Sequence, residues 1–202
     1  MGAKAQGRPR SEKARQAILG AAIDLLEREG FGAVTVEAIA ARAGVSKATV
    51  YRWWPNKAAV VTEGFLEFTA PQIGFIDTGD VREDLRQHMR KLGRMLASGS
   101  GRTIGALIAE SQADPEVAEA FRSRWIAARR AEMKPALRRA VEHGELRSDL
   151  DLDTAIDALY GPIYYRLLTG YAPLSDDFVD VLADYVMSGI CTSNGSVDGK
   201  RE

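Results

Sequence analysis

Residues 35–57 read TVEAIAARAGVSKATVYRWWPNK and contain two short helical segments separated by a glycine. Thr35 and Ser46 carry hydroxyl groups at positions where helix N-caps are preferred, and Pro55 prevents the second helix from continuing. Gly44 stands between the segments, where a residue without a Cβ permits a sharp change of direction. The stretch therefore predicts a helix-turn-helix, a helix pair whose second member can enter the major groove of DNA.

The second of these helices carries side chains suited to nucleic acid. Hydroxyl and basic groups can bind phosphates or base edges, and a methyl group can contact thymine. The candidate residues on this helix are Ser46, Lys47, Ala48, Thr49, Tyr51 and Arg52. Lys57 begins the next helix, where its cation and the free N–H groups of the helix N-terminus favour a phosphate. The alternative is a helical hairpin with a purely structural role, which the caps and the basic face disfavour.

Two adjacent tryptophans, Trp53 and Trp54, follow this helix. Counted from Val50, they lie at i+3 and i+4, and both of these positions can face the same side of a helix as Val50. The periodicity alone therefore leaves open which indole belongs to the core and which to the surface.

The charge is unevenly distributed along the chain. Residues 1–60 carry ten Lys or Arg against five Asp or Glu, and the remainder carries 17 against 23, which together give the net charge of −1. A basic front and an acidic body indicate a head that binds a polyanion. A protein that coats DNA without sequence preference would be basic throughout, so the acidic body disfavours that class.

The apolar pattern is helical almost throughout, without a hairpin signal, and predicts an all-α fold of about nine helices. Ser11 is the expected cap of the first helix, and Pro135 is expected to kink or split a helix over 117–142. The expected organisation is a basic arm over 1–10, a DNA-binding domain over 11–56, a helical ligand-binding and dimerisation domain over 57–192, and a disordered tail over 193–202.

Several function classes receive no support from the sequence. No apolar run approaches the ~18 residues of a membrane span, and the polar, basic N-terminus lacks a secretory core. A single cysteine, Cys191, and two histidines make a disulfide or a zinc site improbable and favour the cytoplasm. No nucleophile–base pair, phosphate loop or metal-ligand spacing indicates an enzyme, so neither catalytic residues nor a cofactor or metal is expected.

The first third of the chain resembles the DNA-binding domain of the TetR family of bacterial transcriptional regulators. The resemblance rests on the amphipathic first helix, the Gly30–Phe31 and Thr35–Val36 pairs, and the Y-x-x-W-x-x-K pattern from Tyr51 to Lys57. It implies that operator DNA is contacted by Thr35, Lys47, Thr49, Tyr51, Arg52, Trp53 and Lys57. It also implies a buried Trp54 that seats the recognition helix and a half-exposed Trp53 whose indole N–H is available to a phosphate.

Two of these positions depart from the common pattern of the family. The position of Arg52 is often aromatic or histidine, and that of Trp54 is often phenylalanine. The base sequence that the protein reads is therefore left open.

The C-terminal part of the chain is similar to TetR-family ligand and dimerisation domains. The segment from Tyr160 to Val186 is similar to the last two helices of such domains, which implies a homodimer through helices at about 152–171 and 175–190. The resemblance implies a repressor that a small molecule releases from its operator. The alternatives are an activator or ligand-independent regulator of the same fold, and a helical enzyme.

A cavity for such a small molecule is expected near the Gly161–Pro162 step, where aromatic residues gather. The candidate ligand-binding residues are His88, Met89, Leu92, Trp125, Arg129, Tyr160 and Tyr164. The alternative for each of them is ordinary core or dimer packing.

Overall fold

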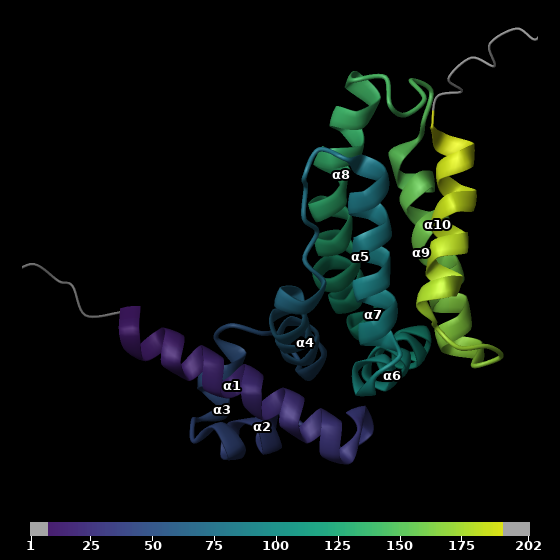
Figure 1. Cartoon of the computed structure of the whole chain (residues 1–202). Coiled ribbons are helices and arrows are strands. Elements are labelled where there is room, and N and C mark those ends of the chain that lie inside the picture. The colour runs from purple at the N-terminus through teal and green to yellow at the C-terminus, as the bar shows by residue number, and fades with distance from the viewer. Residues whose placement is uncertain (1–7, 192–202) are drawn as a thin grey trace, which may run out of the picture. The chain divides into compact units, whose positions relative to one another are not determined.

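In a computed structural model of the chain, which describes residues 8–191, nearly every element is a helix (Figure 1). The elements are α1 (Arg8–Glu29), the 3-10 turn η1 (Phe31–Ala33), α2 (Val36–Ala43), α3 (Lys47–Tyr51), α4 (Lys57–Ile73), α5 (Val81–Leu96), α6 (Gly99–Ala113), α7 (Pro115–Ala120), the π-helical segment η2 (Phe121–Ile126), α8 (Ala127–Glu142), α9 (Leu152–Thr169) and α10 (Asp176–Ile190). Because α7, η2 and α8 follow one another without a break, the described residues form nine helical bodies besides η1. The all-α prediction is confirmed.

The helices form two compact units. Among the described residues, unit 1 comprises those up to Gln72 together with Gly99–Ala128, and unit 2 comprises Ile73–Ser98 together with those from Arg129 onward. Unit 1 thus contains the helix-turn-helix of α2 and α3 together with α1, most of α4, α6, α7 and η2. The predicted boundary between residues 56 and 57 concerns function and stays a prediction.

The first helix begins earlier than the sequence pattern indicated. Because α1 starts at Arg8, Ser11 lies inside the helix, and its predicted capping role is wrong. Residues 8–10 of the predicted arm are helical, whereas residues 1–7 and the predicted tail over 193–202 lie outside the described residues. The amphipathic character expected of the first helix is confirmed, since Ile18, Ala22, Leu25 and Leu26 are buried along one face of α1.

The long helical run from α7 to α8 is irregular at a different place from the one predicted. Pro135 lies within α8, which is not split there. Pro135 has no N–H to donate to the Ala131 carbonyl four residues earlier. Both residues are exposed, so water can bind that carbonyl instead. The irregularity lies instead in η2, where the helix adopts π geometry over Phe121–Ile126.

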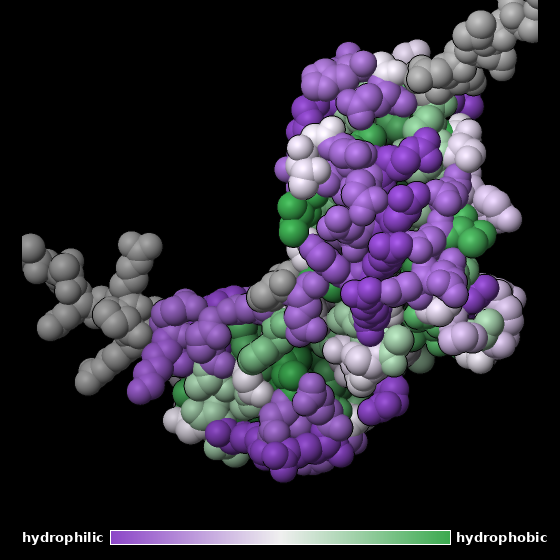
Figure 2. Space-filling view, viewed as in Figure 1, coloured by the Kyte–Doolittle hydropathy of each residue, from purple (hydrophilic) through white to green (hydrophobic). Residues whose placement is uncertain are grey.

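A ladder of ion pairs joins α5 to α10 in unit 2. Three arginines spaced four residues apart on α5 meet three aspartates spaced four residues apart on α10, in the pairs Arg86–Asp184, Arg90–Asp180 and Arg94–Asp176. Hydrophilic side chains accordingly gather on the face of unit 2 that α5 and α10 form (Figure 2). The hydrogen bond from Arg90 lowers the pKa of Asp180 below its ordinary value.

Beneath the ladder, α5 and α10 approach each other closely at one point. A Cβ placed on Gly93 of α5 would lie 3.1 Å from Cγ2 of Val179 on α10. Both residues are buried, and a separation this short is tighter than most real Cβ contacts. The absence of a side chain at Gly93 therefore permits the two helices to pack at this distance.

Candidate nucleic-acid interface

The turn between α2 and α3 has the geometry that the sequence predicted. Gly44 adopts a left-handed conformation with φ of 66°, and its N–H donates to carbonyls of the last turn of α2. The hydroxyl of Thr35 accepts a hydrogen bond from the Ala38 N–H at 3.0 Å. The hydroxyl of Ser46 accepts one from the Thr49 N–H at 3.2 Å. Both predicted N-caps and the glycine turn are confirmed.

The two tryptophans have different environments. Trp54 is 1% exposed, and its indole Nε1 donates to Glu63 Oε2 at 2.9 Å. Trp53 is half-buried and packs edge-on against Trp54, with ring centroids 5.4 Å apart. The predicted division into one core and one surface indole is confirmed. A contact between Trp53 and DNA stays a prediction.

The recognition helix α3 is anchored by Val50, which is fully buried, and its opposite face is open to solvent. The exposed residues of the predicted contact set are Thr35, Ser46, Lys47, Ala48, Tyr51 and Arg52, whereas Thr49 is half-buried. The oxygens of Thr35 and Ser46 accept the capping hydrogen bonds, and the Ser46 hydroxyl also shares a hydrogen bond of 2.9 Å with the Thr49 hydroxyl.

The Lys47 ammonium has a partner on α2. Its Nζ donates to Glu37 Oε1 at 2.9 Å, and both side chains are more than half exposed. This hydrogen bond lowers the pKa of Glu37 and raises that of Lys47. A phosphate contact by Lys47, which would replace this contact with Glu37, stays a prediction.

Lys57 occupies a more enclosed position than a phosphate clamp would need. Its Nζ donates to the Phe31 carbonyl at 3.3 Å and lies 4.6 Å from the centroid of the Phe31 ring. The preceding Asn56 caps α4, because its Oδ1 accepts from the Ala59 N–H at 2.9 Å. Lys57 thus ties the start of α4 to η1, and its predicted phosphate contact stays a prediction.

Two of the candidate ligand-binding residues meet in the core of unit 2. His88 Nε2 lies 2.7 Å from the Tyr160 hydroxyl, and the Phe75 ring lies 5.6 Å from the imidazole. Met89 and Leu92 are buried on the same helix as His88.

The other three candidates have different surroundings. Arg129 is 4% exposed and pairs with Glu132 at 2.8 Å, and Tyr164 is half-buried. Trp125 belongs to unit 1, where it packs against Phe65 with ring centroids 5.2 Å apart. The predicted role of Trp125 in ligand binding stays a prediction.

The pair formed by His88 and Tyr160 is held neutral by its surroundings. Burial lowers the pKa of His88 to about 4, and the positive charges of Arg129 and Lys91 act in the same direction. Burial also raises the pKa of Tyr160 above its ordinary value. At neutral pH the pair therefore presents an uncharged imidazole and an uncharged phenol in the core of unit 2.

The lowered pKa of His88 makes the stability of the protein depend on pH. Since the folded-state pKa lies below the ordinary value of 6.5, the stabilisation is complete above pH 6.5 and is lost as the pH falls toward 4. Between about pH 7 and about pH 5, we expect the free energy of unfolding of the wild type to fall by about 2 kcal/mol more than that of His88→Gln. Urea denaturation at both pH values measures this difference.

His143→Gln, which alters an exposed histidine of the same unit, serves as the control and should behave like the wild type. Equal losses in the wild type and in His88→Gln would contradict the assignment.

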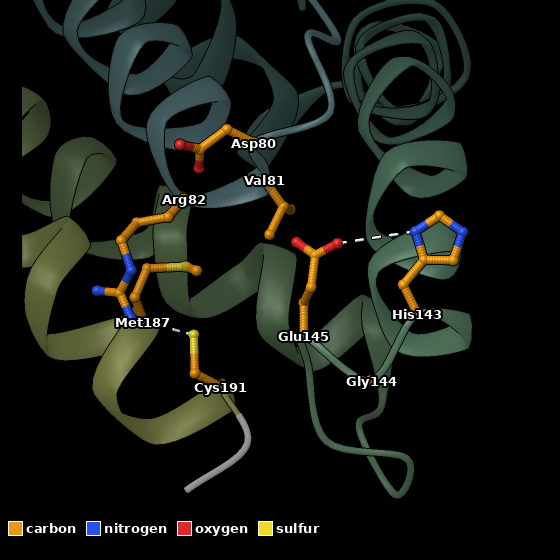
Figure 3. Close-up of a pocket in the computed structure, with 8 residues that line it drawn as sticks. All are labelled: Asp80, Val81, Arg82, His143, Gly144, Glu145, Met187 and Cys191. Carbon is orange, nitrogen blue, oxygen red and sulfur yellow. Dashed lines mark hydrogen bonds and ion pairs between the residues drawn. The ribbon is translucent and has the colours of Figure 1, made fainter. Parts of the chain in front are cut away.

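An open pocket of about 480 Å³ lies at the surface of unit 2 (Figure 3). Its walls are Asp80, Val81, Arg82, His143, Gly144, Glu145, Met187 and Cys191. Arg82 Nη2 lies 3.3 Å from the Cys191 Sγ, and His143 lies 3.7 Å from Glu145. None of the predicted ligand-binding residues lines this pocket. Sequence reasoning missed it because its walls come from three distant segments, and the only local signal was the glycine that ends α8.

Within residues 8–191, no helix is both long and apolar enough to cross a membrane. In the same range, no group of three or more His, Cys, Asp or Glu side chains is placed to hold a metal ion.

A capped helix-turn-helix with an open polar face on its second helix, within an all-helical chain, defines a DNA-binding transcriptional regulator. Residues 18–63 match the family model described as bacterial regulatory proteins, tetR family. Residues 75–186 match the model described as tetracyclin repressor-like, C-terminal domain. The chain belongs to the TetR family of bacterial transcriptional regulators.

Similar proteins span nearly the whole chain. The uncharacterized HTH-type transcriptional regulator YdeS of Bacillus subtilis is 44% identical over 92% of this chain and 93% of its own length. The DNA-binding transcriptional repressor TetR of Mycobacteroides abscessus is 30% identical over 88% of this chain and 94% of its own length. The crystal structure of the TetR family transcription regulator SCO0332 is 37% identical, with a TM-score of 0.78, and the match covers 89% of this chain and 100% of that chain.

Membership of the family decides between the classes that the sequence left open. The TetR family consists of non-enzymatic regulators that bind operator DNA and carry a C-terminal dimerisation domain. The predicted family and fold are confirmed, and the alternative of a helical enzyme is excluded.

Proposed function

We propose that the protein is a homodimeric, cytoplasmic repressor that a small-molecule effector releases from its operator. The observation that carries this proposal is the recognition helix α3, which is anchored by Val50 and followed by the buried Trp54. Its opposite face offers hydroxyl, amine and guanidinium groups to DNA. The proposed contact residues are Thr35, Ser46, Lys47, Ala48, Thr49, Tyr51, Arg52, Trp53 and Lys57.

A dimer is proposed because one helix as short as α3 buries little surface on DNA. A twofold dimer presents two recognition helices to half-sites about 34–36 Å apart, or at multiples of that distance. The surface of α9, α10 and the loop between them supports a dimer, since large apolar side chains there are open to solvent. These side chains are Tyr165, Leu168, Tyr171, Val181 and Tyr185, each at least 50% exposed.

Repression is proposed in preference to activation. The relative from Mycobacteroides abscessus is named as a DNA-binding transcriptional repressor and aligns with most of the chain. The alternatives are an activator and a regulator that needs no ligand. An operator that overlaps a promoter, together with increased transcription in a deletion strain, would distinguish repression from activation.

An effector is proposed to bind in unit 2. The buried pair of His88 and Tyr160 supports this site, because a neutral imidazole and a phenol can each exchange one hydrogen bond with a largely apolar guest. The other candidates in this unit are Met89, Leu92, Arg129 and Tyr164. An effector releases DNA only if it binds better to a conformation whose two recognition helices no longer fit the half-sites.

Selection of bound sequences from a random DNA pool tests the proposed function. A repressor of this kind enriches a palindromic site with two half-sites, and unrelated DNA at the same salt concentration competes poorly. A subsequent screen for small molecules that release the selected DNA tests the effector. Enrichment of no common sequence would contradict sequence-specific binding.

Arg52 is expected to contribute directly to the affinity for DNA. Arg52→Ala should weaken operator binding roughly tenfold, because it removes an exposed guanidinium from the recognition helix. Arg138→Ala removes another exposed arginine, from α8, and should leave the affinity unchanged. Titration by fluorescence anisotropy at fixed salt compares the two variants. Wild-type affinity of Arg52→Ala would show that the contact face is assigned wrongly.

A further inference from the structure

Glu63 of α4 is the meeting point of three other elements of unit 1. Its Oε2 accepts a hydrogen bond from Trp54 Nε1 at 2.9 Å, and its Oε1 accepts one from Arg15 Nη2 of α1 at 2.9 Å. Arg124 of η2 forms a short ion pair with the same Oε2. The Glu63 side chain is 22% exposed, so these three partners take up most of its surroundings.

The bond to Trp54 connects Glu63 to the recognition helix. The Trp54 backbone N–H donates to the Val50 carbonyl at 3.1 Å, so the indole follows the last turn of α3 directly. Because the ring is 1% exposed, its orientation is fixed by packing and by this one charge-assisted hydrogen bond. A shift of the Glu63 carboxylate would therefore move the C-terminal end of α3.

The charge of Glu63 depends on Arg124 for its balance. Arg15 is shared among three carboxylates, because it also pairs with Glu67 at 2.6 Å and Glu12 at 3.1 Å. Arg124 supplies the second positive charge at Glu63. Without the Arg124 guanidinium, the half-buried Glu63 carboxylate would be held only by the Trp54 indole and by Arg15, which also pairs with two other carboxylates. We expect the Glu63 carboxylate then to turn toward Arg15.

The position of Arg124 is set by the π-helical geometry of η2. The neighbouring Trp125 is fully buried against Phe65, which fixes η2 on α4. At α7, Glu116 Oε2 accepts a hydrogen bond from Asn56 Nδ2 at 2.8 Å, close to the start of α4. The run from α7 to η2 therefore contacts the segment after the recognition helix at two places. π segments inside helices are frequently found at functional sites.

We propose that Glu63 is a positioning residue for operator binding, which holds Trp54, and through it the recognition helix, in a placement set by Arg124 of η2. The inference rests on the proposed function, since it concerns the fit of α3 to operator DNA. It implies that Arg124, which contacts Glu63 and is not among the proposed DNA-binding residues, affects the affinity for DNA only through Glu63.

A double-mutant cycle on operator binding tests the proposal. Glu63→Gln keeps an oxygen that can accept from Trp54 but loses the ion pairs, and Arg124→Met keeps the alkyl stem but loses the charge. We expect each single variant to weaken operator binding roughly fivefold and the double variant to be no weaker than either, because the two residues act as a unit. Affinity for unrelated DNA should stay within about twofold of the wild type, since phosphate contacts tolerate a misplaced helix better than base contacts do. A purely structural role would lower both affinities together.

A measurement without DNA separates this inference from the proposed function. In ¹H–¹⁵N spectra, Arg124→Met should shift the indole N–H resonance of Trp54, assigned with Trp54→Phe. Arg122→Met, which changes an exposed arginine of the same segment, should leave that resonance and the operator affinity unchanged. An unshifted Trp54 resonance in Arg124→Met would overturn the proposal, as would additive losses in the cycle. Failure of the wild type to select an operator would count against the proposed function, whereas the spectra would still decide the link between Arg124 and Trp54.

Discussion

Replacement of Trp54 with alanine is expected to lower the free energy of unfolding by about 3–5 kcal/mol. The indole is 1% exposed and fills the space behind α3, so its removal leaves a large cavity. The truncation also deprives Glu63 of the hydrogen bond that it receives at 2.9 Å. Urea denaturation followed by circular dichroism at neutral pH measures the loss.

Trp53 provides the matched control for this prediction. It is the same residue type, one position earlier in the chain, but it is only half-buried. Trp53→Ala should therefore cost about 1 kcal/mol, mostly from its edge-on packing against Trp54. Similar losses in the two variants would mean that the two indoles do not divide into core and surface in solution.

Tyr185→Glu is expected to weaken dimerisation by roughly 100-fold or more. The Tyr185 side chain of α10 is 75% exposed, so the substitution should leave the fold of one chain intact. If the surface of α9 and α10 meets its twofold mate, each dimer buries two added carboxylates where the wild type buries two tyrosines. Operator affinity should fall in parallel, because the two recognition helices are no longer linked.

Sedimentation velocity over a range of protein concentrations measures this effect. Ile76→Glu places the same charge at a residue that is 55% exposed but lies outside α9 and α10, and it should remain dimeric. A Tyr185→Glu protein that sediments as a wild-type dimer would place the dimer interface elsewhere.

Local features of the DNA-binding unit could be predicted because each depends on neighbours in the sequence. The capping hydroxyls of Thr35 and Ser46 and the left-handed Gly44 act within three or four residues, where residue type and position determine the geometry. The assignment of Trp53 and Trp54 needed more than periodicity, since both positions can face inward. The family resemblance supplied it, and the burial of the two rings agrees.

The features that could not be predicted depend on residues far apart in the chain. The contact between Glu63 and Arg124 spans 61 residues, and that between His88 and Tyr160 spans 72. Trp125 likewise packs against Phe65, which lies far from it in the sequence, and its role in ligand binding stays a prediction. The surface pocket of unit 2 was missed for the same reason, as its walls meet only in the folded chain.

The ladder between α5 and α10 has a consequence for how these helices can move. Because both charge series repeat every four residues, a slide of α10 by one repeat, about 6 Å, would restore two of the three pairs, whereas a slide by half a repeat would break all of them. The ladder therefore favours a few discrete registers of α5 and α10 over the intermediate ones. The observed register keeps all three pairs, and the close packing of Gly93 against Val179 favours the same register. An uncharged glycine therefore helps to fix the register at which six charged side chains pair.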